Sequence, residues 1–436
     1  MSAESVHRVT NQADSAGLAQ RLAARRENYD LTAVAGRLLY DPAKKAEEQH
    51  RTCWCHRALK SDGGNGEGLG HIYRRVDGAG ARLTGVVTCG MVWTCKVCAG
   101  RIAEQRRDEL ERAIKFHVST GGHPYLLTLT APHGRELALR EFRRLFGKAL
   151  QKFKNSKAYK RIRAQYQHAG SVRSLELTWG SENGWHLHSH DLYFAAPGLD
   201  GDVRAVDELR GAWVKALLRA GLGDQSKLSW MLEHGLDLRG GQAAADYVTK
   251  FGHDAKHGLS AEITRSHAKI GMRKFAELEG ASVTPFQILA WASEGDAEAC
   301  RLFREYAEAM EDARMLYWSP NLKAKLGVAD VDDADIAADD EPLPEEKNIA
   351  QITGADLALV LSRRALGELL EFVCLVSADF DACVRDFLDA LRSRPPTSKG
   401  IVRVRKFSVG KRPEGSPAFT TMRLIDGTLK AAQANV

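Results

Sequence analysis

Three histidines occupy alternate positions in a segment that otherwise has the pattern of a β-strand, NGWHLHSHDLYF at residues 183–194. Side chains two residues apart on a strand point to the same face, so His186, His188 and His190 share one face of the strand. Imidazole is a common metal ligand, and an added carboxylate makes a mixed site that accepts harder divalent ions. A row of histidines is also typical of a polar sheet surface, so the interpretation depends on the neighbouring residues.

A carboxylate is available on the strand that precedes the histidines. The segment VRSLELTW at 172–179 alternates as a strand, and SENG at 181–184 is a turn signal, so the two strands should form an antiparallel hairpin. Glu176 then falls opposite or nearly opposite His188, and an even pairing register would place both on one face. The sequence does not determine that register.

A nucleophile follows in the segment GGQAAADYVTKFGHD at 240–254. Tyr247 and Lys250 are three residues apart and would share a helix face. A phenol is a poor nucleophile at its ordinary pKa, but a nearby ammonium group and a metal-polarised phosphate favour attack by the phenolate. The alternative is an aromatic side chain packed in the core beside an exposed lysine.

Five of the eight cysteines lie between residues 51 and 100, in a glycine-rich region. The C-x5-C-x2-C spacing ends in a pair typical of a zinc site, and zinc would stabilise a segment too rich in glycine to form its own core. The alternative is a set of free thiols. The proposed ligands are Cys89, Cys95 and Cys98, with a fourth from Cys55 or Cys53, or else from His56 or His71.

The composition is that of a globular protein, with 44% hydrophobic and 27% charged residues among 436. No apolar run approaches the roughly 18 residues of a membrane span, so we expect no membrane partner. The first residues are polar and charged, unlike a secretory signal, and we therefore expect a cytoplasmic protein. In that reducing compartment, metal binding by thiolates or plain burial is favoured over disulfides.

The net charge of +6 is unevenly distributed. Residues 135–163 contain eleven Lys or Arg and two acidic residues, whereas residues 330–346 contain nine acidic residues and no basic one. The basic segment can contact nucleic-acid phosphates or can be a solvated helix face. The acidic segment, with Pro342 and Pro344, has the composition of a solvated linker.

The order of the predicted elements is β-α-β-β-α-β-α, which indicates an α+β fold with an antiparallel sheet and flanking helices, in the ferredoxin-like manner. Strands are expected at 125–132, 172–179 and 185–195 and around KLSWMLEH at 227–234, with helices at 99–118, 135–165 and 202–220 and from about 242. The predicted division is a weakly structured segment at 1–50, a zinc module at 51–118, a catalytic domain at 119–275, a helical extension at 276–329, an acidic linker at 330–348, and a C-terminal helical unit with a basic tail at 349–436.

Five ordered motifs, spread over residues 85 to 325, resemble one known family, the rolling-circle plasmid replication initiators of the HUH endonuclease superfamily. The motifs are TCGMVWTCKVCAGRIAEQRRDEL, YLLTLTAP, LELTWGSENGWHLHSHDLYF, AADYVTKF, and the stretch from TPFQILAWASEGD to MLYWSPNLK, the last resembling actinobacterial-type members.

The resemblance implies a metal-dependent endonuclease that nicks one strand at a plasmid's double-strand origin. In this family a tyrosine becomes joined to the 5′ phosphate and the freed 3′ hydroxyl primes synthesis. Tyr247 would be the nucleophile, His188 and His190 the paired ligands of Mg²⁺ or Mn²⁺, and Glu176 a third ligand or a close neighbour. Lys250 would stabilise charge, and His186 would be the flanking histidine, a less certain ligand.

The implied partners are origin DNA, presented as an unpaired or extruded strand, host helicase and polymerase, and a second copy of the chain in a homodimer. Two features depart from the family. Ser189 and Asp191 stand where apolar residues are usual, which affects the packing beneath the site. Ala243 stands where some members place a glutamate that helps to end replication, so termination would need another group.

Two other functions remain open. A conjugative relaxase or single-strand transposase would use the same chemistry, although a tyrosine downstream of the histidines and the cysteine-rich segment favour an initiator. A zinc-containing DNA-binding regulator without cleavage activity would bind DNA in a salt-sensitive manner without Tyr247 or a divalent ion.

Overall fold

The computed structural model describes residues 11–61, 68–250, 282–376 and 379–395 and short strands beyond residue 402, with side chains described only within 23–61, 68–248, 282–376 and 379–395. This part of the chain divides into two compact units. The central unit contains residues 99–250 and 282–332, and the terminal unit contains the residues up to 98 and from 333 onward. Among the described residues, no helix combines the length and apolar character needed to cross a membrane.

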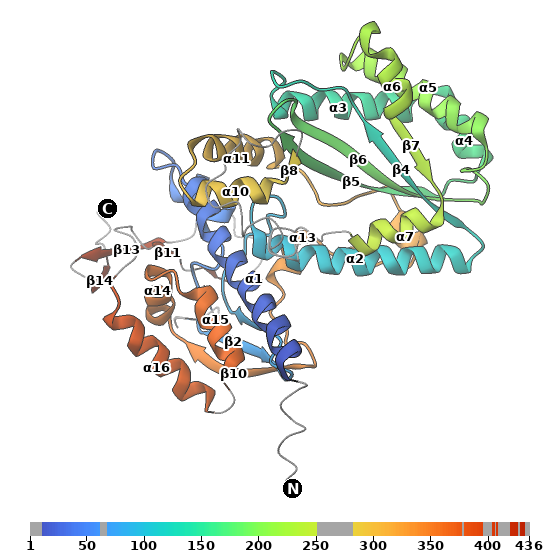
Figure 1. The fold of residues 1–436 in the computed structure, drawn as a ribbon. Helices are drawn as coiled ribbons and strands as arrows, with labels where there is room; N and C mark the ends of the chain where they lie inside the picture. Colours follow the sequence, from blue (N-terminus) through green and yellow to red (C-terminus); the bar gives the residue numbers. More distant parts are fainter. Residues whose placement is uncertain are drawn as a thin grey trace. The chain divides into compact units, whose positions relative to one another are not determined.

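The central unit is built on an antiparallel sheet with the strand order β7-β4-β6-β5-β8, and β9 pairs with the opposite end of β5 from β8 (Figure 1). Four strands of this unit, β4 to β7, lie in the sheet order of the ferredoxin-like motif, in which the fourth strand pairs with the first and the third lies between the first and the second. This arrangement confirms the predicted α+β class. The strands are β4 (His123–Thr130), β5 (Gly170–Gly180), β6 (Gly184–Ala195), β7 (Leu236–Arg239), β8 (Ser282–Val283) and β9 (Tyr317–Trp318).

Helices flank this sheet. In α3 the side chains of Phe142, Phe146 and Phe153 recur at helical spacing and are buried. The rings of Phe146 and Phe153 both lie 5.6 Å from Trp213 of α5, so α3 and α5 pack together. The helices are α2 (Lys96–Ser119), which begins at the end of the terminal unit, α3 (Leu139–Lys154), α4 (Lys157–Gln165), α5 (Val203–Ala220), α6 (Leu228–His234), α7 (Gly241–Lys250), α10 (Pro285–Ser293), α11 (Ala297–Met310) and α12 (Leu322–Lys325), with a 3-10 turn η3 at Gln225–Lys227.

The strand predicted around 227–234 is wrong. The side chain of Asp224 accepts the backbone N–H of Ser226 at 2.8 Å and begins a helical turn that continues into α6. The strand β7 follows only after Gly235, where Leu236–Arg239 pair with β4. Within α6 only Met231 is buried.

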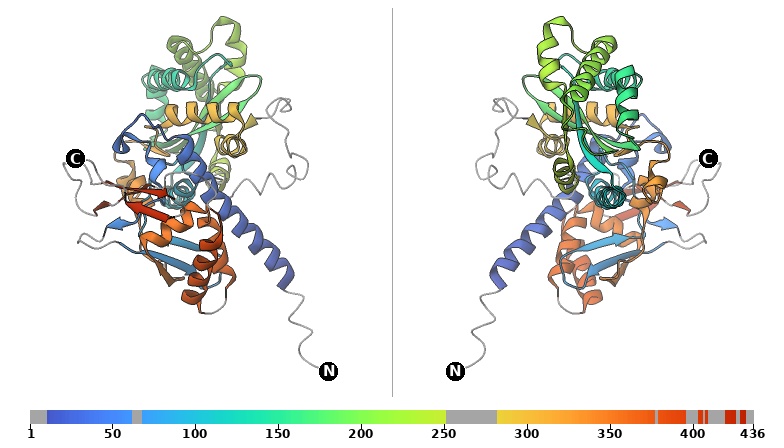
Figure 2. Two further views of the ribbon diagram at one scale, coloured as in Figure 1. Left: turned by 90° about the vertical axis from the view of Figure 1, so that its left-hand side faces the viewer. Right: turned by 90° about the vertical axis from the view of Figure 1, so that its right-hand side faces the viewer.

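The terminal unit combines the two ends of the chain. Its main sheet has the antiparallel order β10-β2-β3, and Figure 2 shows the blue strands β2 and β3 against the orange helices. Ile72, Ile352 and Leu369 are fully buried in the shared core. The elements are α1 (Asn11–Leu38), η1 (Ala46–Glu48), η2 (Arg51–Trp54), β1 (Lys60–Ser61), β2 (Gly70–Arg75), β3 (Ala81–Thr84), α13 (Asp333–Ala338), β10 (Glu346–Ile352), α14 (Gly354–Ser362), α15 (Leu366–Leu375), α16 (Phe380–Ser393), β11 (Arg403–Arg405), β12 (Phe407–Ser408), β13 (Phe419–Ile425) and β14 (Thr428–Ala431).

The N-terminal segment is more regular than expected. Residues 1–50 were predicted to be weakly structured, but α1 has 28 residues. Leu31 and Ala35, one helical turn apart, are buried because this face of α1 packs against α15 and η2. The observed domain division also differs from the predicted one, which had six segments in consecutive order along the chain. Residues 51–98 and 349–395 fold into one unit, in which β2 pairs with β10.

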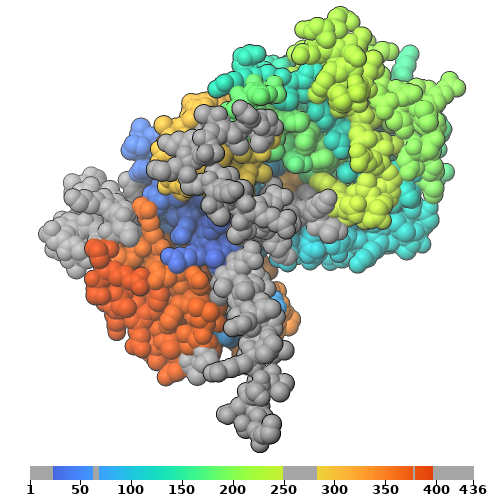
Figure 3. All heavy atoms as spheres, in the orientation of Figure 1, coloured from blue at the N-terminus to red at the C-terminus, as the bar shows by residue number. Residues whose placement is uncertain are grey.

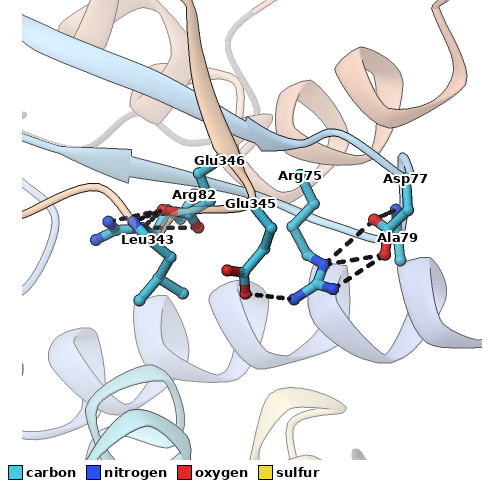
Figure 4. Close-up of polar contacts among 7 residues, drawn as sticks. All are labelled: Arg75, Asp77, Ala79, Arg82, Leu343, Glu345 and Glu346. Atoms are coloured by element: carbon cyan, nitrogen blue, oxygen red, sulfur yellow. Dashed lines mark hydrogen bonds and ion pairs between the residues drawn. The ribbon is translucent and has the colours of Figure 1, made fainter.

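The acidic segment contains regular structure and is held to the sheet near its end, although most of its residues are exposed. Residues 333–338 form α13, and Glu346 begins β10. Figure 4 shows the ion pair between Arg82 and Glu346, and Arg75 beside Asp77 and Glu345. The Arg82 Nε atom lies 2.9 Å from Glu346 Oε2. Opposite charges from β2 and β3 therefore hold residues whose composition alone suggested exposure.

We expect Glu346→Gln to lower the free energy of unfolding by about 3 kcal/mol, because it leaves the Arg82 guanidinium partly buried without its anion. The Glu346 side chain is only 6% exposed. Glu345→Gln is the matched control, since Glu345 is 45% exposed and 3.1 Å from Arg75, and such pairs contribute less than about 1 kcal/mol. Urea unfolding measures both variants, and equal losses would contradict the role given to burial.

Candidate active site

The β5–β6 hairpin brings the predicted carboxylate and histidines together. Glu176 pairs with His188, Ser174 pairs with His190, and Thr178 pairs with His186, so the even register is confirmed. The register is set at the turn, where Gly184 has φ +70°, a left-handed conformation that favours glycine, and a Cβ there would lie 3.0 Å from the Cα of Arg135. Glu176, His188 and His190 consequently share one face of the sheet.

Three ligand atoms converge on this face. The Glu176 Oε2 atom lies 3.1 Å from His188 Nε2 and 2.7 Å from His190 Nε2. The two imidazoles hold the pKa of the Glu176 carboxyl well below its usual range, so it is ionised. The Glu176 side chain is 53% exposed and the histidines are 19% and 15% exposed, so the group is open on one side. Two imidazole nitrogens and a carboxylate oxygen are a donor set that fits a divalent cation.

His186 lies beside this group and is not part of it. Its Nε2 atom is 3.4 Å from His188 Nδ1, and its ring stacks on His133 with centroids 4.7 Å apart. Burial, with the neighbouring His188 and His133, lowers the pKa of His186 to about 4, so its ring is neutral. The structure therefore places His186 next to a ligand imidazole rather than with the three converging atoms.

Tyr247 reaches the same face from α7. Ala244 and Val248 lie one helical turn apart and are both buried, so the side of α7 that carries them faces the sheet. The Tyr247 ring lies 5.1 Å from the His190 ring, and its hydroxyl is hydrogen-bonded to the Ser174 hydroxyl. Burial raises the pKa of the Tyr247 phenol above its usual value, so the resting side chain is neutral. Lys250 ends α7, but its side chain lies outside the described residues.

The helix α3, which carries much of the basic segment at 135–163, lies on the other side of the sheet. Lys154 of α3 is 3.3 Å from Asp191 of β6, and Asp191 points away from the histidine face and is fully buried. In Figure 1, α3 and α5 flank one side of the sheet and α7 the other. The apolar stripe of α3 therefore directs this helix to the face opposite the histidines, and contact of its basic residues with DNA stays a prediction. Lys154 also accounts for the unusual Asp191, whose charge it balances.

A second convergent group lies in the terminal unit. The Cys55 sulfur is 3.6 Å from that of Cys98 and 3.4 Å from that of Cys95, and the Cys89 sulfur is 3.7 Å from that of Cys98. Four sulfurs bound tetrahedrally to zinc at 2.3 Å lie about 3.8 Å apart, so the spacing fits zinc. All four thiols are buried. Cys55 rather than Cys53 completes the set, and His71 instead contacts Asn348 at 3.1 Å.

Comparisons with known proteins find that the chain is similar to two Streptomyces proteins. The chain is similar to a Streptomyces lividans protein named Protein rep. The two are 25% identical over 317 residues, which cover 59% of this chain and 67% of that protein. A Neomycin resistance protein from Streptomyces cyanogenus is 27% identical over 156 residues, or 30% of this chain and 36% of that protein. No family model and no solved structure matches the chain.

Two site residues were missed in the sequence. Ser174 contacts the Tyr247 hydroxyl, and the Thr128 hydroxyl lies 3.1 Å from His190 Nδ1. Both stand directly opposite His190, Ser174 on β5 and Thr128 on β4. Once the hairpin register is known, Ser174 can be found as the cross-strand neighbour of His190. Thr128 requires the pairing of β4 with β6, which no local pattern indicates.

Proposed function

We propose that this protein is a plasmid replication initiator that nicks one strand of its origin DNA through Tyr247. The observation that carries the proposal is the contact between the Tyr247 ring and the His190 ring. His190 is itself a member of the group of converging ligands with Glu176 and His188. The similarity to Protein rep of Streptomyces lividans supports the replication role. It also favours an initiator over a relaxase or transposase with the same chemistry.

In this mechanism Glu176, His188 and His190 would hold Mg²⁺ or Mn²⁺. An ion held there would supply charge that polarises the scissile phosphate and offsets the charge that develops on it. The phenolic oxygen of Tyr247 forms a bond to phosphorus while the bond from phosphorus to the 3′ oxygen breaks. The phenolic proton leaves, and the departing 3′ oxygen takes up a proton. The new 5′-phosphotyrosine bond replaces the broken ester, so strand transfer needs no ATP.

The substrate is an unpaired strand of the origin that reaches the α7 side of the sheet. A stiff duplex presents its phosphates less readily to a tyrosine held between a helix and a sheet. In the space-filling view, the yellow-green atoms that include α7 form part of the surface of the central unit (Figure 3). Host helicase and polymerase would act on the nicked product, and a second subunit or Asp246 would be needed to end replication without a glutamate at Ala243.

The test is nicking of a supercoiled plasmid that carries the protein's own origin, with Mn²⁺ or with EDTA. We expect open circles and protein attached to 5′ ends only with the metal, and no product from a plasmid that lacks the origin. Equal DNA binding under both conditions without cleavage would contradict the proposal. That outcome would favour the alternative, a zinc-containing DNA-binding regulator.

Thr128 provides a prediction about the metal ligands themselves. Its hydroxyl contacts His190 Nδ1, while His190 Nε2 faces Glu176 in the group that would hold the metal. Loss of such a partner typically lowers metal affinity by about 10- to 100-fold. We expect Thr128→Val to show this loss in calorimetric titration with Mn²⁺, and Thr128→Ser to restore binding. Native affinity in Thr128→Val would show that His190 needs no such support.

A further inference from the structure

Ser174 lies where a strand residue can control the position of the nucleophile. It stands on β5 directly opposite His190 and two residues before Glu176, so its side chain shares the face of the converging ligands. The residue is only 5% exposed. Its hydroxyl is hydrogen-bonded to the hydroxyl of Tyr247.

The backbone of α7 does not by itself determine where the phenol oxygen lies. The helix is held at its start by the Gly241 N–H, which donates to His123 Nε2 at 3.1 Å, and along its length by Ala244 and Val248. These contacts place the Cα atom of Tyr247. The ring still has its own side-chain torsions, and the hydroxyl lies at the far end of them. The contact with Ser174 acts at that far end.

We propose that Ser174 is a positioning residue that holds the Tyr247 hydroxyl beside the ligand group before DNA binds. The inference rests on the proposed function, because it assigns Ser174 to the tyrosine nucleophile of that reaction. A hydroxyl both donates and accepts, so Ser174 can accept from the neutral phenol and can donate to the phenolic oxygen after its proton has left. The hydrogen bond is therefore kept throughout the attack.

The chain offers a matched set of variants. Ser174→Ala removes the hydroxyl, and Ser174→Thr keeps it with one added methyl group. Ser189→Ala is the control, because Ser189 is a fully buried serine on the neighbouring strand β6 between the two ligand histidines. Its side chain points to the opposite face of the sheet, and its hydroxyl has no hydrogen-bond partner among the described residues.

The first measurement is the single-turnover rate of covalent attachment to a single-stranded origin oligonucleotide at increasing concentration. We expect Ser174→Ala to lower the maximal rate by about tenfold, the effect of one hydrogen bond. The half-saturating DNA concentration and the affinity for Mn²⁺ should not change. Ser174→Thr should recover most of the rate, and Ser189→Ala should react as the native protein does. A native maximal rate in Ser174→Ala, or a change only in half-saturation, would overturn the proposal.

The second measurement needs no DNA and no metal. With 3-fluorotyrosine incorporated, the ¹⁹F resonance of Tyr247 is assigned by its loss in Tyr247→Phe. We expect Ser174→Ala to shift or broaden this resonance and Ser189→Ala to leave it in place. An unchanged resonance in Ser174→Ala overturns the inference whatever the DNA reaction shows. If the resonance moves but native protein never attaches to DNA, the contact stands and the proposed function is what has failed.

Discussion

Replacement of Tyr247 by phenylalanine is expected to abolish covalent attachment to DNA and to reduce nicking by at least about a thousandfold, because the variant lacks the attacking oxygen. The ring is kept, and Ala244 and Val248 still hold α7 on the sheet. DNA binding and Mn²⁺ affinity should therefore stay within about twofold of the native values. Denaturing gels of labelled origin DNA measure attachment, and agarose gels of supercoiled plasmid measure nicking.

The control for this variant is Tyr306→Phe. Tyr306 is a fully buried tyrosine of α11 in the same unit, and its ring packs 5.9 Å from Trp185 near the start of β6. Loss of its hydroxyl should leave attachment unchanged. Attachment by Tyr247→Phe at the native rate would show that another residue is the nucleophile, and the role given to α7 would have to be abandoned.

Cys95→Ser is expected to remove zinc and to destabilise the terminal unit by about 5 kcal/mol or more, since the free energy of metal binding contributes directly to folding. The four thiols come from separate parts of the chain: Cys55 follows η2, Cys89 lies after β3, and Cys95 and Cys98 flank the start of α2. A bound zinc would therefore tie three backbone segments together. Metal analysis of the purified protein and thermal unfolding measure the two effects.

Cys53→Ala separates this effect from the loss of any buried cysteine. Cys53 is 4% exposed, like Cys55, but lies outside the group of converging sulfurs. We expect this variant to keep one equivalent of zinc and to lose no more stability than a small core truncation. Full zinc occupancy in Cys95→Ser, or loss of zinc in Cys53→Ala, would contradict the assignment of the ligands.

Local patterns predicted much of the candidate site. Alternation along a strand placed three histidines on one face, and a short turn allowed Glu176 to lie opposite His188, which the register confirms. The C-x2-C spacing identified Cys95 and Cys98 as a pair. These predictions depend on residues close together in the sequence, where backbone geometry leaves few arrangements.

Longer-range relationships were predicted less well. The acidic segment had the composition of a linker, yet Glu346 pairs with Arg82, whose strand lies more than 250 residues earlier. The position of the basic helix α3 was not predicted, and its apolar stripe packs on the face of the sheet opposite the histidines. Charge content shows that a segment can attract an opposite charge, but it does not show which partner the fold supplies.

The sequence by itself determined the α+β class, the histidine hairpin and the presence of a tyrosine on the helix that follows the sheet. Only the tertiary structure decided that Cys55 completes the sulfur group, that His186 lies outside the ligand group, and that Ser174 and Thr128 flank His190. The physical reason is that strand and helix periodicity set the direction of a side chain within its own element. Which side chains then meet depends on the packing and pairing of elements far apart in the chain, and that is settled only when the whole core is buried.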